Sequence, residues 1–185
     1  MMHEDRTIYG ASRNQSIEEN QVADRYFKTP FSKSGILNKK AITEASKELI
    51  EKFVVKCDGP EAYVKTLSGG NVQKVVASRE FSSTPRLLVA SHPTRGIDVG
   101  ATDLIRRKIV DLRDEVNSAI LLFSADLNEL INVSDSIIVM FKGQIAAYFP
   151  DLTGITPEIL GEYMLGVKKM SDEEIAKVIF DKEVK

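Results

Sequence analysis

Two short apolar runs separated by an amphipathic segment constrain the fold of this 185-residue chain more than any other feature. The runs are Leu87–Ala90 and Ile120–Phe123, and each has the length and composition of a strand buried in a parallel sheet. Between them, residues 102–115 repeat apolar side chains at helical spacing, which predicts a helix with one apolar face. Strands that alternate with helices indicate an α/β fold, and we expect a three-layer core from residue 67 onward.

The rest of the chain supports this reading. Residues 136–141 and 144–149 flank Lys142-Gly143, a two-residue turn typical of a β-hairpin. Upstream of residue 67 the chain is more polar, and residues 12–35 are expected to be part helix and part exposed loop. The remaining predicted helices cover residues 42–53, 71–81, 126–132, 157–164 and 172–180.

Composition excludes several classes of protein. The net charge of −2 provides no basic surface for nucleic acid. The apolar runs are far shorter than the roughly 20 residues of a membrane span, and the polar start excludes a secretory signal. Cys57 is the only cysteine, so the chain cannot form an internal disulfide. We therefore expect a soluble, cytoplasmic protein or fragment without a nucleic-acid partner.

The segment around residues 66–74 has the composition of a phosphate-binding turn. Gly69 and Gly70 follow Ser68 at the predicted start of a helix. Glycine lets the backbone approach an anion closely, and the first N–H groups of a helix point at it with the positive end of the dipole. The Ser68 hydroxyl adds a further donor. This segment therefore predicts a place for a phosphate.

Three segments, taken in order, resemble the motifs of the ATP-binding cassette ATPases. Residues 67–71 match the signature motif, residues 87–98 the Walker B strand with the D-loop, and residues 121–127 the switch strand with the H-loop. The variants Ser-Gly-Gly-Asn and Pro-Thr-Arg-Gly-Ile-Asp-Val-Gly-Ala are most similar to the second cassette of double-cassette importers for sugars and nucleosides. His3-Glu4-Asp5-Arg6 is similar to the segment that these cassettes carry at the Q-loop.

The resemblance is to the C-terminal part of a cassette. A P-loop reads G-x-x-x-x-G-K-[ST], but none of the eleven glycines is followed by lysine. The implied fold is a partial P-loop NTPase core with parallel strands, a C-terminal β-hairpin and an α-helical subdomain, without the P-loop strand. The resemblance divides it into a Q-loop remnant with the helical subdomain (1–66), the signature helix with half of the ATPase core (67–150) and C-terminal helices (151–185).

The missing strand has a consequence for the sheet. In the family, the P-loop strand lies between the strands that correspond to residues 120–123 and 136–141. Without it, both neighbours would expose unpaired backbone. We expect these two strands either to close the gap or to pair with another chain.

The resemblance also implies a degenerate catalytic site. The family's Walker B strand ends in an aspartate that organises Mg²⁺ and a glutamate that polarises the attacking water. Ser91 and His92 stand at these positions, and Ala125 replaces the switch histidine. No catalytic residue is therefore intact, and no metal ligand is expected. A Ser91–His92 acid–base pair or a Ser68–His92–Asp98 triad is disfavoured, since no nucleophile-elbow pattern surrounds Ser68.

The signature, by contrast, is intact. Two cassettes of this family sandwich two ATP molecules head to tail, so Ser68, Gly69, Gly70 and Asn71 would contact the phosphates of ATP held by a partner cassette. Asp98 would lie in the D-loop at the dimer interface. The resemblance implies a fragment of the ATP-binding subunit of a sugar or nucleoside importer. ATP and Mg²⁺ are expected in the assembled dimer, while the isolated chain is not expected to bind or hydrolyse ATP.

The implied partners are a second cassette, transmembrane permease subunits and, indirectly, a substrate-binding protein. They would hold the chain on the inner face of the cell membrane. A catalytically inactive regulatory or interaction module is the alternative, and a cassette ATPase of translation or repair is disfavoured by the net charge. Two roles stay open: Arg95 is a dimer-interface group or a solvated side chain, and Glu4 is a sensor of the transmembrane partner or a frayed terminal carboxylate.

Overall fold

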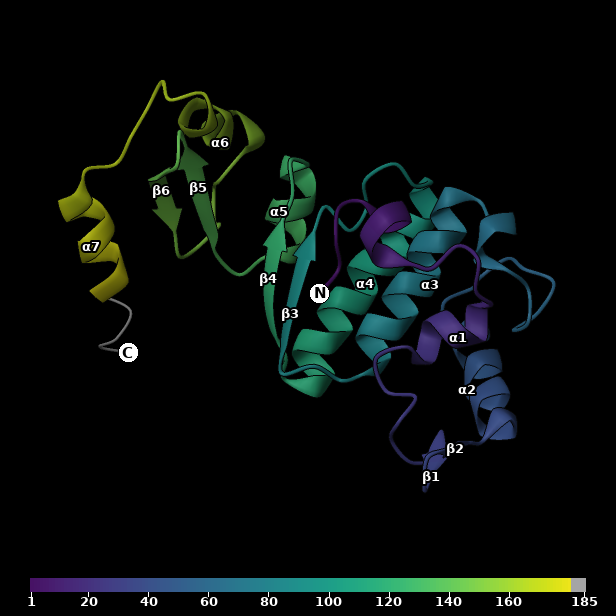
Figure 1. Cartoon of the computed structure of the whole chain (residues 1–185). Helices are drawn as coiled ribbons and strands as arrows, with labels where there is room; N and C mark the ends of the chain where they lie inside the picture. The colour runs from purple at the N-terminus through teal and green to yellow at the C-terminus, as the bar shows by residue number, and fades with distance from the viewer. Residues whose placement is uncertain (181–185) are drawn as a thin grey trace. The chain divides into compact units, whose positions relative to one another are not determined.

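The computed structural model describes residues 1–180, apart from the side chains of Arg6, Thr7 and Phe180, and it consists of two compact units (Figure 1). The first unit covers Met1–Phe123, and the second begins at Ser124. Residues 181–185, the end of the expected C-terminal region, lie outside the described residues. The three-part functional division expected from the sequence remains a prediction.

The N-terminal half of the first unit is mainly helical. It contains a π-helical turn η1 (Arg6–Gly10), α1 (Ile17–Val22), a small hairpin of β1 (Ser32–Lys33) and β2 (Ile36–Leu37), α2 (Lys39–Lys52) and a 3₁₀ turn η2 (Val64–Thr66). Ser16 starts α1 with a capping box, because its Oγ accepts the Glu19 N–H while the Glu19 carboxylate accepts the Ser16 N–H. The stretch expected to be part helix and part loop is therefore both, but its hairpin was not predicted.

A buried glutamine ties three helices of this unit together. Gln21 of α1 accepts a hydrogen bond from Ser46 of α2 at 2.6 Å and donates one to Ser78 of α3 (Gly69–Ser82) at 2.8 Å. All three side chains are fully buried. Since both ends of the amide are satisfied, this contact fixes the helices without leaving a buried polar atom unpaired.

The second half of the first unit contains the parallel strands expected from the sequence. β3 (Leu87–Ser91) pairs with β4 (Ala119–Phe123), and α4 (Val99–Val116) connects them and contacts α3. Met2 lies on the other edge of β3, where its N–H donates to Val89 O and its carbonyl accepts from Ser91 N, both at 2.9 Å. The α/β fold class is therefore confirmed.

The expectation that both strands are buried in a three-layer core is wrong. In the parallel register, Leu88 and Ala90 lie on a face that is buried, with exposures of 2% and 0%. The opposite face carries Leu87, Leu121 and Phe123, which are 58%, 47% and 50% exposed. Alternate side chains of a strand point to opposite faces, so the first unit itself covers only one face of this pair.

The second unit has its own core. It contains α5 (Leu127–Val133), β5 (Ile137–Phe141), β6 (Gln144–Phe149), α6 (Pro157–Met164) and α7 (Asp172–Phe180). The hairpin predicted at Lys142-Gly143 is confirmed, with φ values of 47° and 78° that suit a tight hairpin turn. The core side chains are Ile137, Val139, Ala146, Ala147, Phe149 and Leu160.

The expectation that the strands at 120–123 and 136–141 close the gap is also wrong. β4 pairs with β3, whereas β5 pairs with β6 in a separate sheet. Pairing across a two-residue turn closes the smallest loop, so the β5–β6 hairpin forms at low entropic cost. Pairing of β4 with another chain remains a prediction. No helix within residues 1–180 is both long and apolar enough to cross a bilayer.

Candidate functional site

The start of α3 leaves its donors available. Ser68 is the N-cap residue in extended conformation, but its side chain does not cap the helix. Instead, Ser68 Oγ accepts a hydrogen bond from Asn71 Nδ2 at 3.0 Å, which leaves the hydroxyl proton for another acceptor. The first N–H groups of a helix have no partner within it. An exposed helix end with a serine and two glycines therefore offers several donors in one place.

Two side chains of α3 hold this helix start against the segment that follows α2. Asn71 Oδ1 accepts the Lys56 N–H at 2.9 Å, and Lys74 Nζ donates to Val54 O at 3.0 Å. Lys74 is only 8% exposed. Both contacts bind the backbone of residues 54–56, so the position of the helix start depends on the end of α2.

Asp98 lies beside the start of α3. A Cβ on Gly70 would meet Asp98 Oδ2 at 2.9 Å, so a larger residue there would force the Asp98 carboxylate to shift. Asp98 is the N-cap of α4, where Oδ1 accepts the Ala101 N–H at 2.9 Å. That hydrogen bond, followed by the charges of Lys74 and Lys56, lowers the pKa of Asp98. The structure thus brings residues 68–71 and Asp98 together.

Gln73 joins α3 to the turn after β3, and the sequence reading missed it. Its Nε2 donates to Pro93 O at 2.7 Å, and the side chain is 2% exposed. Its Oε1 is buried without a hydrogen bond. The sequence carries no clear signal for this contact, because the burial of Gln73 and its partner Pro93 O follow from the packing of α3.

The end of β3 carries Ser91 and His92. The His92 N–H donates to Phe123 O at 2.7 Å, and the residue has a φ of 47°, which turns the chain at the strand end. Both side chains are half-buried, and neither is a carboxylate. Within residues 1–180, no group of three His, Cys, Asp or Glu side chains is placed to hold a metal ion.

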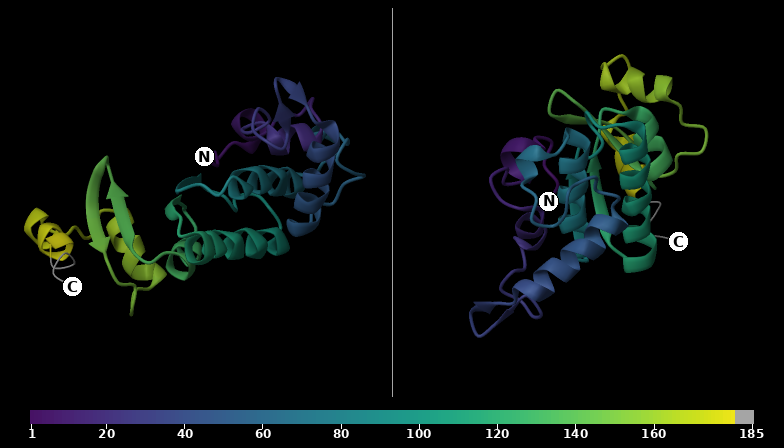
Figure 2. Two further views of the ribbon diagram at one scale, coloured as in Figure 1. Left: turned by 90° about the horizontal axis from the view of Figure 1, so that it is seen from below. Right: turned by 90° about the vertical axis from the view of Figure 1, so that its right-hand side faces the viewer.

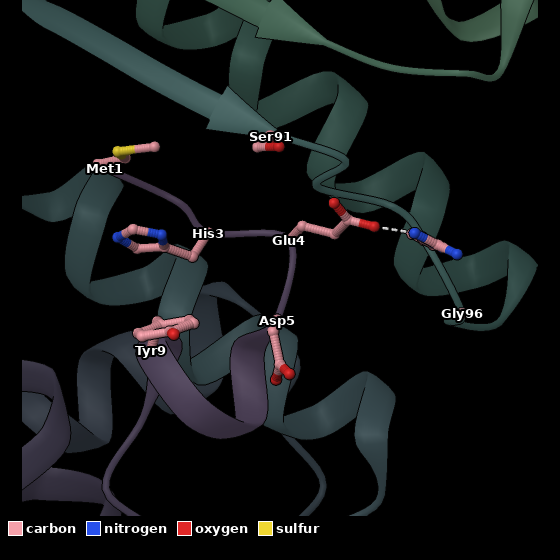
Figure 3. A pocket seen from close by; sticks show the side chains of 8 residues that line it. Met1, His3, Glu4, Asp5, Tyr9, Ser91 and Gly96 are labelled. Atoms are coloured by element: carbon pink, nitrogen blue, oxygen red, sulfur yellow. Dashed lines mark hydrogen bonds and ion pairs between the residues drawn. The ribbon is translucent and has the colours of Figure 1, made fainter.

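An open hollow of about 670 Å³ lies at this strand end (Figure 3). Glu4 and Arg95 form an ion pair across it, and the His3 ring lies 5.4 Å from that of Tyr9. The Q-loop-like segment therefore meets the residues that follow β3, and the Glu4 side chain is engaged with Arg95. The side chain of Arg6 in that segment lies outside the described residues. The lining residues are Met1, His3, Glu4, Asp5, Tyr9, Ser91, Arg95 and Gly96.

Ala125 belongs to the second unit, whereas Ser91 and His92 belong to the first. It is an exposed residue just before α5. Around it, Ser124 Oγ donates to the buried Glu129 at 2.6 Å, and Asp126 caps α5 by accepting the Glu129 N–H at 3.1 Å. The small side chain adds no functional group to this turn.

Similar sequences come from import proteins. The nucleoside import ATP-binding protein NupA of Lactococcus lactis subsp. cremoris is 40% identical over 164 residues, which cover 88% of this chain and 32% of that protein. The guanosine import ATP-binding protein NupO of Bacillus subtilis is 36% identical over 89% of this chain and 31% of its own length. The chain thus spans about a third of the length of these curated relatives. No family model matches it.

Solved structures agree on the fold. The dimeric ATP-binding cassette MJ0796, in a post-hydrolysis state with ADP and Pi, has a TM-score of 0.64 at 19% identity. The match covers 75% of this chain and 57% of the cassette. A nucleotide-free ATP-binding cassette from an ABC transporter has a TM-score of 0.61 over 82% of this chain and 63% of that cassette, at 20% identity. By sequence, the chain is thus a homologue of sugar and nucleoside import ATP-binding proteins, and the solved structures show that it has the fold of the ATP-binding cassettes of ABC transporters.

Proposed function

We propose that this chain is part of the ATP-binding subunit of a sugar or nucleoside importer and contributes the signature half of a shared ATP site. In this site, Ser68, Gly69, Gly70 and Asn71 face the phosphates of ATP bound by another cassette. The observation that carries the proposal is the start of α3, where Asn71 and Lys74 hold the helix in place while the Ser68 hydroxyl stays available. The names of NupA, NupO and the ribose import ATP-binding protein RbsA support the transport role.

The residues at the start of α3 fit a phosphate. Gly69 and Gly70 place no side chain between the helix end and an anion, and the helix dipole favours negative charge there. The nearby Asp98 carboxylate opposes an anion, but its charge is partly balanced by the Ala101 N–H and by Lys74 and Lys56. Asp98 would then act as the D-loop residue that couples this contact to α4.

Ser91 and His92, at the end of β3, supply no carboxylate to organise Mg²⁺ or to polarise a water. Ala125, in the second unit, carries no group able to contact a γ-phosphate. We therefore derive no hydrolysis step at this chain's own strand end. The chain assists hydrolysis at the partner's site, where ATP and Mg²⁺ are bound in the assembled dimer.

The proposed partners follow from this role. They are the second cassette, the permease subunits that respond to cassette closure and, through them, a substrate-binding protein. The helical segment 1–66 would pass the motion on, residues 67–150 would form the contact with ATP, and residues 151–185 would complete the C-terminal part. In this arrangement the chain lies on the cytoplasmic face of the membrane.

ATP-dependent association tests the proposal. The full chain is mixed with an ATP-binding cassette that carries an intact P-loop and is made deficient in hydrolysis, and binding is measured with and without MgATP. We expect association only with MgATP, and Ser68→Arg should abolish it because the side chain fills the phosphate position. Ser171→Arg is the matched control, since Ser171 precedes α7 and caps it as Ser68 precedes α3.

Equal loss in both variants would contradict the proposal. Association that does not depend on ATP would favour the interaction module instead. In a second arm, the chain alone is titrated with ATP by calorimetry. Micromolar binding would contradict the idea that the chain holds only half of a site.

A further inference from the structure

The most exposed apolar side chains between α1 and α2 gather in one basic segment of the first unit. Residues 26–40 contain four lysines and no aspartate or glutamate, in a chain with a net charge of −2. The same segment exposes Tyr26 by 50%, Phe27 by 61%, Ile36 by 75% and Leu37 by 55%. Positive charge and exposed apolar surface therefore coincide here. We call residues 26–40 the basic tip.

Local contacts give the basic tip a defined structure. β1 and β2 pair through Ser32↔Leu37 and Lys33↔Ile36 around a turn at Ser34 and Gly35, whose φ values are 52° and 81°. The Asn38 N–H donates to Phe31 O at 2.8 Å, which closes the hairpin onto the preceding loop. The tip is thus a folded feature that presents its side chains together.

The aromatic and basic side chains of the tip lie against one another. The rings of Tyr26 and Phe27 meet edge to face at 5.6 Å, and Lys28 Nζ lies 5.7 Å from the centre of the Phe27 ring. Lys28, Lys33, Lys39 and Lys40 are all exposed, and Lys39 forms an exposed ion pair with Glu61 at 3.3 Å. Figure 1 and both views of Figure 2 show the hairpin projecting from the helices of the first unit.

We propose that the basic tip binds the surface of an anionic lipid bilayer. Lysines near such a surface are attracted to its negative charge, while aromatic and aliphatic side chains enter the boundary between headgroups and acyl chains. A projecting hairpin suits a flat surface, because its side chains reach the surface without a matching groove. The lysines alone could bind an acidic protein. The exposed apolar side chains of Ile36 and Leu37 favour a lipid surface, because they can enter its acyl-chain boundary. The proposal goes beyond the signature role and does not depend on it.

Vesicle binding tests the proposal. The full chain is mixed with vesicles of phosphatidylcholine alone or with about 30% phosphatidylserine, and bound protein is measured by flotation. We expect binding to the anionic vesicles to be at least roughly tenfold stronger, and to fall steeply when NaCl is raised because the attraction is electrostatic. Each Lys→Gln change in the tip should weaken it roughly fivefold.

A matched pair of variants distinguishes vesicle binding by the basic tip from non-specific binding by other exposed apolar surfaces, such as the exposed face of β4. The tip variant carries Phe27→Ser and Lys28→Gln. The control carries Tyr63→Ser and Lys65→Gln, because Lys65 lies over the exposed Tyr63 ring at 5.1 Å just as Lys28 lies over Phe27. We expect loss of binding only in the tip variant, with an unchanged thermal transition in both.

Three results would overturn the proposal. They are absence of binding to anionic vesicles, equal binding to both vesicle types, and equal loss in the tip and control variants. Tight binding of the tip to polyglutamate but not to vesicles would likewise overturn it and assign the surface to an acidic protein. A second charge variant, Lys33→Gln with Lys40→Gln, changes only exposed side chains and keeps the test valid if Phe27→Ser fails to fold.

Discussion

The start of α3 and the end of β3 lie in the same unit, and Gln73 links them, but they are built in opposite ways. At the start of α3, Asn71 and Lys74 bind the backbone of residues 54–56, and the Ser68 hydroxyl that could face a phosphate stays available. At the end of β3, Ser91 and His92 contact the rest of the unit through their backbone, and neither position holds a carboxylate. Under the proposed function, this difference separates a contact that would serve a partner's ATP site from a strand end that would not support hydrolysis of its own.

The largest expected effect comes from Gly70→Ala, which disturbs the start of α3. The new Cβ would lie 2.9 Å from Asp98 Oδ2, whose carboxylate is held by the Ala101 N–H. We expect ATP-dependent association with the P-loop cassette to weaken roughly a hundredfold, which corresponds to about 2.7 kcal/mol. Binding measurements with MgATP check this.

Gly161→Ala is the control for that variant. Gly161 is a helical glycine of α6, and a Cβ there would meet nothing within 4 Å. Alanine should therefore stabilise the chain by up to about 1 kcal/mol and leave association unchanged. If Gly70→Ala behaved in the same way, the close approach of Asp98 would have no functional role.

A smaller effect is expected from Gln73→Met, which cuts the link between the two regions. The change removes the 2.7 Å hydrogen bond to Pro93 O, but it also removes the unsatisfied Oε1. We expect a loss of about 1 kcal/mol in the free energy of unfolding, measured by urea denaturation.

Gln21→Met provides the contrast, because both ends of the Gln21 amide are bonded to buried serines. Its loss should be larger, about 2–4 kcal/mol, since two buried hydroxyls lose a partner. Equal losses in the free energy of unfolding for the two variants would show that the unbonded Oε1 of Gln73 does not destabilise the fold.

The smallest effect concerns pH. The pKa of Asp98 is lowered by the Ala101 N–H and then by Lys74 and Lys56, so its carboxylate form is favoured in the folded state. A group with a depressed folded pKa stabilises the fold above its unfolded pKa, near about 3.9, and this contribution is lost as the pH falls through the folded pKa. Thermal unfolding of Asp98→Asn should therefore show a weaker loss of stability below pH 4 than the unmodified chain does. An identical acid profile would show that the Asp98 charge does not contribute.

Local signals predicted most of the second unit. Thr156 and Pro157 mark the start of α6, and Lys142-Gly143 marks the hairpin turn, because each acts through the backbone of its immediate neighbours. The β1–β2 hairpin was missed since its strands are only two residues long and show no alternation. Exposure of β4 was also mispredicted, because an apolar run does not reveal whether another element covers it.

The sequence by itself determined the order of helices and strands from residue 67 onward, the family resemblance and the residues at the signature and strand-end positions, because motifs and periodicity are local properties. Only the tertiary structure decided that Gly70 meets Asp98, that Gln73 reaches Pro93 and that Glu4 pairs with Arg95. These partners are far apart in the chain, and their contacts depend on how α3, α4 and β3 pack. That packing places an accessible helix start next to a carboxylate, whereas the ordered motifs alone indicated only that both exist.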